Sequence, residues 1–310
     1  MDYAPILISV YTRLDHLIRC VESLKHNKIA KDSILYVVSD AAANISDEDK
    51  VNAVRLYLKS ITGFKEIEIL EWKMNLGSQR SIPQAINYVF ENHDKLIFLE
   101  DDNFLAPNFL SFVNKGLIAY EDRSDIFSVS GYNSPFEMPL FYKNDVYLRF
   151  GFVAWGVGIW KKKWVKVDWS MKEFNSFVDN ETKISKFKEI AENCTGQIQS
   201  MRKSGALLVD GVVAVHLVDK GMYSIFPVIS RVRNYGLDGS GEHCGVNDIY
   251  LNQRIYEEEV DAIFPLDISP DAQLLDFIQK QYRLSWVKRI IQKLPMEFKA
   301  KVKRFILNRD

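Results

Sequence analysis

Three acidic residues follow an apolar run in this 310-residue sequence. The segment KLIFLEDDNF, residues 95–104, places Glu100, Asp101 and Asp102 directly after four large apolar side chains. Crowded carboxylates repel one another and burial raises their pKa values, so a cluster of this kind needs a compensating cation. Oxygen ligands favour Mg²⁺ or Mn²⁺, and Mg²⁺ usually takes one or two carboxylates together with substrate phosphates. The alternative is that the acids cap the helix beginning near Pro107.

The elements that must position these acids follow from the periodicity of the first 130 residues. Apolar runs typical of strands alternate there with helical patterns. We expect strands at 5–11, 34–40, 67–72 and 95–100, and helices at 14–25, 47–61, 81–93 and 107–121. Strands separated by helices predict a doubly wound, mostly parallel α/β sheet covered on both faces.

Ligands of such sheets bind beyond the carboxyl ends of the strands. Tyr11, Asp40, Asn75 and the acids at 100–102 all fall at predicted strand ends or in the loops that follow them. These loops are therefore expected to point into one crevice.

From about residue 130 the pattern changes to irregular, aromatic-rich sequence, then to helical stretches near 181–220, then to the Gly-rich segment YGLDGSGEHCG. No repeat or low-complexity linker separates these parts. We expect one catalytic unit with an α/β half (1–130), an acceptor-side half (131–270) and a C-terminal tail (271–310).

The Gly-rich segment lacks the lysine and spacing of a P-loop. It offers mobility and backbone donors, as a lid over a diphosphate would, through Gly239, Ser240 and Gly241. Arg231 and Arg233 alternate with Val232 on a predicted strand, so both are expected to point to one face, either toward phosphate or into solvent. His243 is either a metal ligand or a residue of a surface turn.

Composition and charge narrow the class of protein. The chain is 47% hydrophobic and 26% charged, and its three cysteines form no CxxC pair, so a globular protein of a reducing cytoplasm is expected, without a disulfide framework or a zinc site. No signal peptide, membrane-spanning run or nucleic-acid partner is expected. Residues 281–310 hold nine Lys and Arg against two acids, a net +7 that leaves −8 elsewhere, since the whole chain carries −1.

That basic tail has apolar residues at helical spacing, which is typical of a helix lying on an anionic membrane surface. A helix packed on its own domain with a solvated basic face is the alternative.

The acids and the residues that follow them resemble the DXD-type element of GT-A glycosyltransferases. The match is to the version found in the N-acetylglucosaminyltransferase that begins complex N-glycan branching and in bacterial surface-polysaccharide glycosyltransferases. Further similar segments follow in family order over residues 4–250: PILISVYTRLDHLIRCVESL, YVVSDAA, NLGSQRSIPQAINYVF, FVAWGVGIWKKKW and SIFPVISRVRNYGLDGSGEHCG.

The resemblance implies roles for individual residues. It makes Asp102 the ligand of a metal, Mn²⁺ or Mg²⁺, that bridges the donor diphosphate, with Glu100 and Asp101 around the ribose or the metal. It assigns contacts with the nucleotide sugar to Tyr11, Thr12, Arg13, Asp40, Asn75 and Gly77. It places Trp155, Trp160 and Lys161 on the acceptor side, although buried aromatics and a strand end in solvent are the ordinary alternatives.

An inverting transferase also needs one carboxylate as general base for the acceptor hydroxyl. Family order implies Asp210 in GALLVDGVVAVHLVDKGMYSIFPVISR, although many relatives have an aromatic residue where this chain has Gly211. Asp219 and Asp168 are the alternatives, and a helix cap is the structural explanation of Asp210.

These expectations combine into a metal-dependent inverting glycosyltransferase. It would move a sugar from a nucleotide-diphosphate donor, most simply a UDP-sugar, to a saccharide acceptor, such as a polyprenyl-diphosphate-linked precursor of O-antigen or capsule. It would be cytoplasmic and peripheral on the inner face of the cytoplasmic membrane. A sugar nucleotidyltransferase is disfavoured because its Gly-rich opening is missing. A non-catalytic sugar-nucleotide-binding or scaffold protein of a polysaccharide assembly complex is the remaining alternative.

Overall fold

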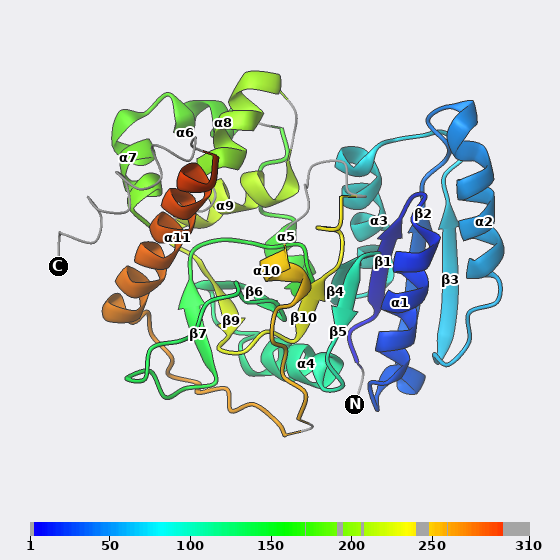
Figure 1. Cartoon of the computed structure of the whole chain (residues 1–310), viewed down its shortest axis with the longest axis horizontal. Helices are drawn as coiled ribbons and strands as arrows, with labels where there is room; N and C mark the ends of the chain where they lie inside the picture. Colours follow the sequence, from blue (N-terminus) through cyan, green and yellow to red (C-terminus); the bar gives the residue numbers. More distant parts are fainter. Residues whose placement is uncertain are drawn as a thin grey trace.

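The computed structural model describes residues 3–170, 172–190, 195–205, 208–239, 248–258 and 260–293. Its central element is an eight-stranded mixed sheet with the order β3-β2-β1-β4-β8-β6-β9-β7 (Figure 1). The strands are β1 (Ile6–Val10), β2 (Ile34–Ser39), β3 (Glu66–Glu71), β4 (Lys95–Glu100), β6 (Ile126–Ser130), β7 (Val146–Arg149), β8 (Val157–Trp160) and β9 (Tyr223–Pro227). The predicted α/β class is confirmed, and strands on either side of residue 130 share one sheet.

The sheet is parallel where the sequence pattern predicted it. Parallel pairing joins β1 to β2 and β4, β2 to β3, and β6 to β9. Antiparallel pairing joins β8 to β4 and β6, and β7 to β9. The helices α1 (Leu14–Lys25), α2 (Glu48–Leu58) and α3 (Ser78–Asn92) connect the first four strands. Short 3₁₀ turns lie at Ala30–Asp32 and Ile45–Asp47.

The remaining elements cover the second half of the sheet. They are α4 (Phe109–Ala119), α5 (Lys161–Trp164), α6 (Lys172–Val178), α7 (Glu181–Ile190), α8 (Thr195–Ser204), α9 (Val209–Lys220), α10 (Asp248–Leu251) and α11 (Ala272–Lys293). A separate two-stranded sheet pairs β5 (Asn103–Leu105) with β10 (Val232–Asn234).

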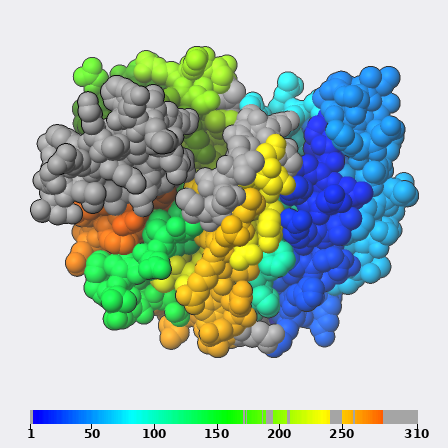
Figure 2. Space-filling model, in the orientation of Figure 1, coloured from blue at the N-terminus to red at the C-terminus, as the bar shows by residue number. Residues whose placement is uncertain are grey.

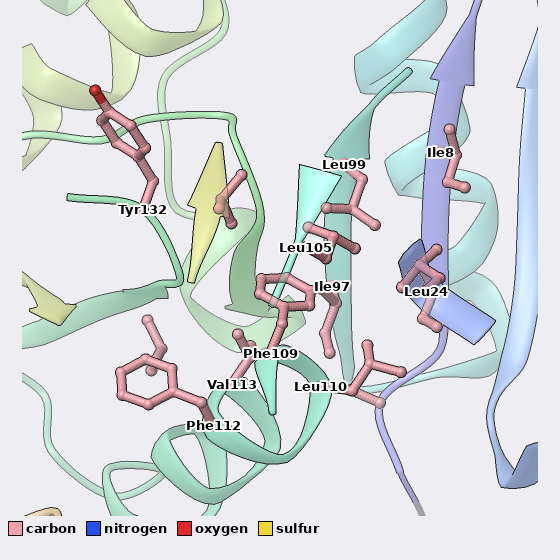
Figure 3. Packing of buried hydrophobic residues seen from close by; sticks show 14 of the residues in the cluster. Ile8, Leu24, Ile97, Leu99, Leu105, Phe109, Leu110, Phe112, Val113 and Tyr132 are labelled. Atoms are coloured by element: carbon pink, nitrogen blue, oxygen red, sulfur yellow. The ribbon is translucent and has the colours of Figure 1, made fainter. Parts of the chain in front are cut away.

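Two hydrophobic cores lie on opposite faces of the sheet because strand side chains alternate in direction. In β1, Ile6 and Ile8 pack into the core that contains residues of α1, α2 and α4, whereas Leu7 packs into the core with α3 and α9. Figure 3 shows the first of these cores, where Ile97 of β4 lies near Leu110 of α4 and Leu99 lies near Leu105 of β5. Both faces of β4 are therefore closed to water, and its acids lie at the end of a buried strand.

Lys163 is a buried cation with a structural role in this second half. Its Nζ donates hydrogen bonds to the carbonyl oxygens of Tyr120, Arg123 and Ile126 at 3.3, 3.0 and 2.5 Å. It also lies 3.5 Å from the centre of the Trp160 ring. Burial lowers the pKa of Lys163 to about 7. The side chain thus satisfies carbonyl groups after α4 that would otherwise be buried without donors.

The first part of α11 packs on the sheet. Leu274 and Ile278 form a small core with Tyr147 of β7 and Phe226 of β9. The hydroxyl of Tyr282 accepts a hydrogen bond from Arg149 and lies 2.6 Å from Ser134 Oγ. Up to Tyr282, then, the tail is part of the folded domain. Residues 294–310, and the side chains of residues 283–293, lie outside the described part of the chain.

Among the described residues, no helix is both long enough and apolar enough to cross a membrane.

Replacing Lys163 by Met is expected to lower the free energy of unfolding by about 2–4 kcal/mol, because three carbonyl groups lose their donor. The matched control is Lys162→Met, since Lys162 is half exposed and pairs with an exposed aspartate. Urea denaturation followed by circular dichroism measures both. Equal stability of the two variants would contradict the structural role of Lys163.

Candidate functional site

The register of the parallel strands brings the predicted strand-end residues to one edge. Ser9 of β1 lies beside Glu100 of β4, and Val10 lies beside Ser39 of β2. Tyr11, Asp40 and the acids at 100–102 therefore leave the sheet at the same end, as the sequence predicted.

Arg13 is the cation that compensates the acids. Its guanidinium forms an ion pair with Asp101, and its Nη2 lies 2.8 Å from Asp102 Oδ2. Both carboxylates are buried, at 3% and 7% exposure. Burial raises the pKa of Asp101 to about 7, although Arg13 opposes this shift. The Arg13 pKa is raised by the two carboxylates despite the opposing effect of burial.

Glu100 is compensated only in part, because the charge of Arg13 lowers its pKa but does not offset the groups that raise it. Burial raises its pKa well above the ordinary value, and the charges of Asp102, Asp210 and Asp101 raise it further. Among the described residues, its carboxylate makes neither a hydrogen bond nor an ion pair. Full ionisation of the acids at the end of β4 would therefore place more negative charge there than Arg13 balances.

Asp102 is held by two asparagines that the sequence analysis did not single out. Asn103 and Asn234 donate hydrogen bonds to Asp102 Oδ1 at 3.0 and 2.9 Å. The pairing of β5 with β10 places Asn103 opposite Asn234. A Cβ at Gly236 would lie 2.1 Å from Asp102 Oδ2, so only glycine fits there. The pairing joins three-residue strands far apart in the chain, and no sequence signal could have revealed it.

The segment from Tyr235 to Gly239 contacts α1 beside the acids. His16 Nε2 lies 3.1 Å from Asp238 Oδ2, and the Arg19 guanidinium lies 4.4 Å from the centre of the Tyr235 ring. Figure 2 shows this segment, in yellow, directly against the blue surface of the N-terminal helix. The first residues of the predicted donor-covering loop thus lie beside Asp102.

Asp210 reaches the same site from the second half of the chain. It stands in the first turn of α9. Burial raises the pKa of Asp210 to about 7. The charge of Asp210 contributes to the raised pKa of Glu100, so the two carboxylates are close enough to interact.

The two alternatives to Asp210 lie elsewhere. Asp219 is near the C-terminal end of α9, where it pairs with Lys183 and Lys220, and the hydrogen bond from Lys183 is the largest cause of its lowered pKa. Asp168 accepts hydrogen bonds from Ser170. Both line a small cavity of about 10 Å³ beside His216.

The residues predicted on the nucleotide side shape two adjoining loops. Both oxygens of Asp40 accept hydrogen bonds from backbone N–H groups, including those of Leu76 and Gly77 at 2.8–3.2 Å. Asn75 Nδ2 donates to the Ala41 carbonyl at 2.7 Å. Asp40 therefore holds the loop that begins α3, where Gly77 has a φ of 68°.

Tyr11 and Thr12 lie in the turn between β1 and α1. The Tyr11 hydroxyl donates to Asp47 Oδ2 at 2.8 Å and accepts from the Ala43 N–H at 2.8 Å. The Thr12 carbonyl accepts from the Leu14 N–H.

The two arginines of the late segment, Arg231 directly before β10 and Arg233 within it, both bind protein groups. The Arg231 guanidinium is 2% exposed and lies 4.3 and 4.4 Å from the rings of Phe112 and Tyr256. Arg233 donates to the Gln253 carbonyl at 2.8 Å. Arg231 is therefore buried against aromatic rings, which corrects the expectation that it faces phosphate.

The predicted acceptor-side residues separate along β8. Because β8 runs antiparallel to β4, Val157 lies beside Phe98 near the acids, whereas Trp160 lies beside Lys95 at the opposite end. Trp160 is 1% exposed and donates to the Leu117 carbonyl, and the Lys161 N–H donates to the Asp94 carbonyl. Trp160 and Lys161 therefore lie away from the acids, and their predicted place on the acceptor side was wrong. Trp155, partly buried against Tyr132, is at the correct end.

Gly239, with a φ of 93°, ends the described part of the Gly-rich segment. Ser240, Gly241 and His243 lie outside the described residues.

The carboxylate oxygens of the site suit a hard cation, but the described side chains alone do not surround one. Within the described residues, no three His, Cys, Asp or Glu side chains are arranged to hold a metal ion. Carboxylates of Glu100 and Asp102 are suitable ligands, and substrate phosphates commonly complete the coordination of Mg²⁺. A cation at Asp102 Oδ2 would share or replace the contact with Arg13.

No protein-family model matches this chain, and comparison with curated proteins finds no match. Similar solved structures include the mannosyltransferase PcManGT from Pyrobaculum calidifontis in complex with GDP-Man and Mn²⁺, at 13% identity and a TM-score of 0.38, covering 52% of this chain and 46% of that one. Another is S. aureus TarS 1–349, at 13% identity and a TM-score of 0.36, covering 51% of this chain and 47% of that one. The chain thus spans less than half the length of these structures. Likeness at this level carries no argument about activity.

Replacing Arg13 by Met is expected to lower the free energy of unfolding by about 2–3 kcal/mol at about pH 8, because buried carboxylates lose their counter-ion. The loss should be smaller at about pH 5. Asp101 has a folded-state pKa of about 7, above its ordinary 3.8, so it is mostly protonated in the fold at the lower pH.

Urea denaturation at both pH values tests this expectation. Arg202→Met, at an exposed arginine whose partner is also exposed, is the control. A loss in the Arg13 variant that does not depend on pH would contradict the compensating role.

Proposed function

We propose that this protein is a glycosyltransferase that moves a sugar from a nucleotide-diphosphate donor to a hydroxyl group of a saccharide acceptor. The observation that carries the proposal is the convergence of Asp210 with the acids at the end of β4. These groups come from distant parts of the chain. The acids at the end of β4 would bind the diphosphate leaving group through a cation, and Asp210 would act as the base for the acceptor hydroxyl.

The charge of the site supports a need for a divalent cation. Arg13 pairs with Asp101 and Asp102, and the charges of these two aspartates and of Asp210 raise the pKa of Glu100. A diphosphate would be repelled by this arrangement unless additional positive charge accompanied it. Asp102, with Glu100 or Asp101, would hold Mn²⁺ or Mg²⁺. When bound, the ion would neutralise charge on the departing diphosphate.

The environment of Asp210 suits a general base. A pKa of about 7 leaves the carboxylate available near neutral pH while keeping it basic enough to accept a proton from a hydroxyl group. A single base acting on the acceptor is the requirement of an inverting mechanism, which we propose together with a UDP-sugar donor and a lipid-linked acceptor.

Asp210→Asn and Asp102→Asn are each expected to lower kcat/KM for sugar transfer by roughly 10²–10⁴, through loss of the base and of the cation ligand. Asp219→Asn, on the same helix as Asp210, is the control and should stay within about twofold of the unmodified protein. The donor is chosen by a thermal-shift screen of nucleotide sugars with and without Mn²⁺.

The pH dependence and the effect of a chelator belong to the same experiment. The rate should rise with pH up to about 7, because Asp210 must be unprotonated, and EDTA should abolish transfer until Mn²⁺ is restored. Full activity in EDTA would contradict the role of the cation, and full activity of Asp210→Asn would contradict the role of the base.

A non-catalytic sugar-nucleotide-binding protein is the second candidate. It is favoured by the contacts of Asp102, whose oxygens are engaged by Arg13, Asn103 and Asn234. Single-turnover release of nucleotide from a labelled donor separates the two, since a binding or scaffold protein would retain the donor intact.

The basic end of the chain supports a peripheral position on an anionic membrane surface. Removal of residues 294–310 should lower binding to vesicles that contain anionic lipid, and donor hydrolysis should be unchanged. A truncation at 281 would be unsuitable because it removes Tyr282, which contacts Arg149 and Ser134. Vesicle co-sedimentation measures the change, and equal binding by the shortened and full chains would exclude this segment as the membrane contact.

A further inference from the structure

We propose that Arg55 of α2 is a positioning residue for the donor nucleotide, because it fixes the ends of β2 and β3 from which the nucleotide-side loops leave the sheet. The inference rests on the proposed nucleotide-diphosphate donor. Neither the sequence motifs nor the chemistry of the strand-end acids assigned Arg55 to the site.

Arg55 binds main-chain oxygens at the carboxyl ends of two neighbouring strands. Its Nη2 donates to the carbonyl of Trp72, directly after β3, at 2.8 Å. The same nitrogen lies 3.4 and 3.3 Å from the carbonyl oxygens of Ser39 and Asp40, at the end of β2, and Nε donates to Ser39 Oγ at 3.3 Å. Carbonyl groups at the end of a sheet need donors from elsewhere, and a guanidinium offers several in a fixed fork. Arg55 therefore joins the two strand ends.

The carboxylate of Asp40 ties the same loops a second time. Its Oδ1 accepts from the N–H groups of Ala41 and Leu76 at 2.9 and 3.0 Å, and its Oδ2 accepts from those of Leu76 and Gly77 at 3.2 and 2.8 Å. Asp40 is buried, so these contacts occupy both of its oxygens. A nucleobase would therefore meet the loops that Asp40 orders rather than the carboxylate itself.

The segment between β3 and α3 is consequently held at both ends. At its start, Trp72 offers its carbonyl to Arg55 and donates its indole N–H to Ser81 Oγ, near the beginning of α3, at 2.8 Å. At its end, Leu76 and Gly77 bind Asp40. Loss of Arg55 frees the first of these ends. Fewer molecules would then hold the loops in the binding arrangement, and the apparent Kd would rise by the inverse of that fraction.

The test is binding of UDP and of GDP, each with Mn²⁺, to the full chain by isothermal titration calorimetry. Arg55→Met keeps the aliphatic part of the side chain and removes the donors. It should raise the Kd of the tighter-binding nucleotide about tenfold, as expected if roughly one molecule in ten stays competent. The ratio of the two Kd values should stay within about twofold, because Arg55 orders the loops for either base. In the transfer assay the donor KM should rise by the same factor at unchanged kcat, and Arg55→Lys should recover part of the loss.

Two control variants separate this role from other effects of the side chain. Glu71→Gln removes the ion pair with Arg55, at 3.7 Å, and leaves the contacts with the carbonyl groups in place. Lys50→Met changes an exposed residue on the same helix. Both controls should bind the nucleotides within about twofold of the unmodified protein.

Amide hydrogen exchange in the nucleotide-free protein, followed by NMR, is the second readout. The N–H groups of Leu76 and Gly77 should exchange about tenfold faster in Arg55→Met, and that of Val37 within β2 should not change. Unchanged nucleotide affinity or unchanged exchange at Leu76 and Gly77 would overturn the inference, and so would equal acceleration at Val37, which reports a general loss of stability. If the unmodified protein binds neither nucleotide, the proposed donor fails, while the exchange rates still decide whether Arg55 orders these loops.

Discussion

The concentration of negative charge at the end of β4 is the constraint on which the rest of the site depends. Hydrophobic cores close both faces of the strand, so Glu100, Asp101 and Asp102 emerge where water is scarce and mutual repulsion is strong. Arg13 pairs with both Asp101 and Asp102, so one positive charge faces two carboxylates, and full ionisation of Glu100 and Asp210 would add two further negative charges. A site built in this way favours ligands that bring positive charge with them, which is why we associate it with a cation and a diphosphate.

Asp102 is also the point at which three parts of the chain meet. Helix α1 reaches it through Arg13, β5 through Asn103, and β10 through Asn234. The close approach of Gly236 completes the enclosure. The Asp102 carboxylate therefore has a structural role in addition to its proposed chemical one. Its contacts link the end of β4 to β10 and to Arg13, the residue before α1.

Much of the fold could be predicted from periodicity. The strand at 95–100 and the helix at 14–25 were predicted with the bounds that the structure shows, because long apolar patterns with one period are hard to satisfy otherwise. Other predictions were right only in part. Alternation predicts one face for Arg231 and Arg233, but it does not say what lies there, and in the structure they contact Tyr256 and the Gln253 carbonyl.

Local sequence patterns predict the α/β class and the acids at the end of a buried strand, and the order of motifs leads us to propose Asp210 as the base. The end of β8 that faces the acids, and with it the separation of Trp155 from Trp160 and Lys161, follows from the antiparallel pairing of β8 with β4. The contacts of Asn234 and Gly236 with Asp102 likewise depend on the folded chain. Packing between distant segments sets the direction of a strand and the approach of a loop, and it leaves no periodic signal in the sequence.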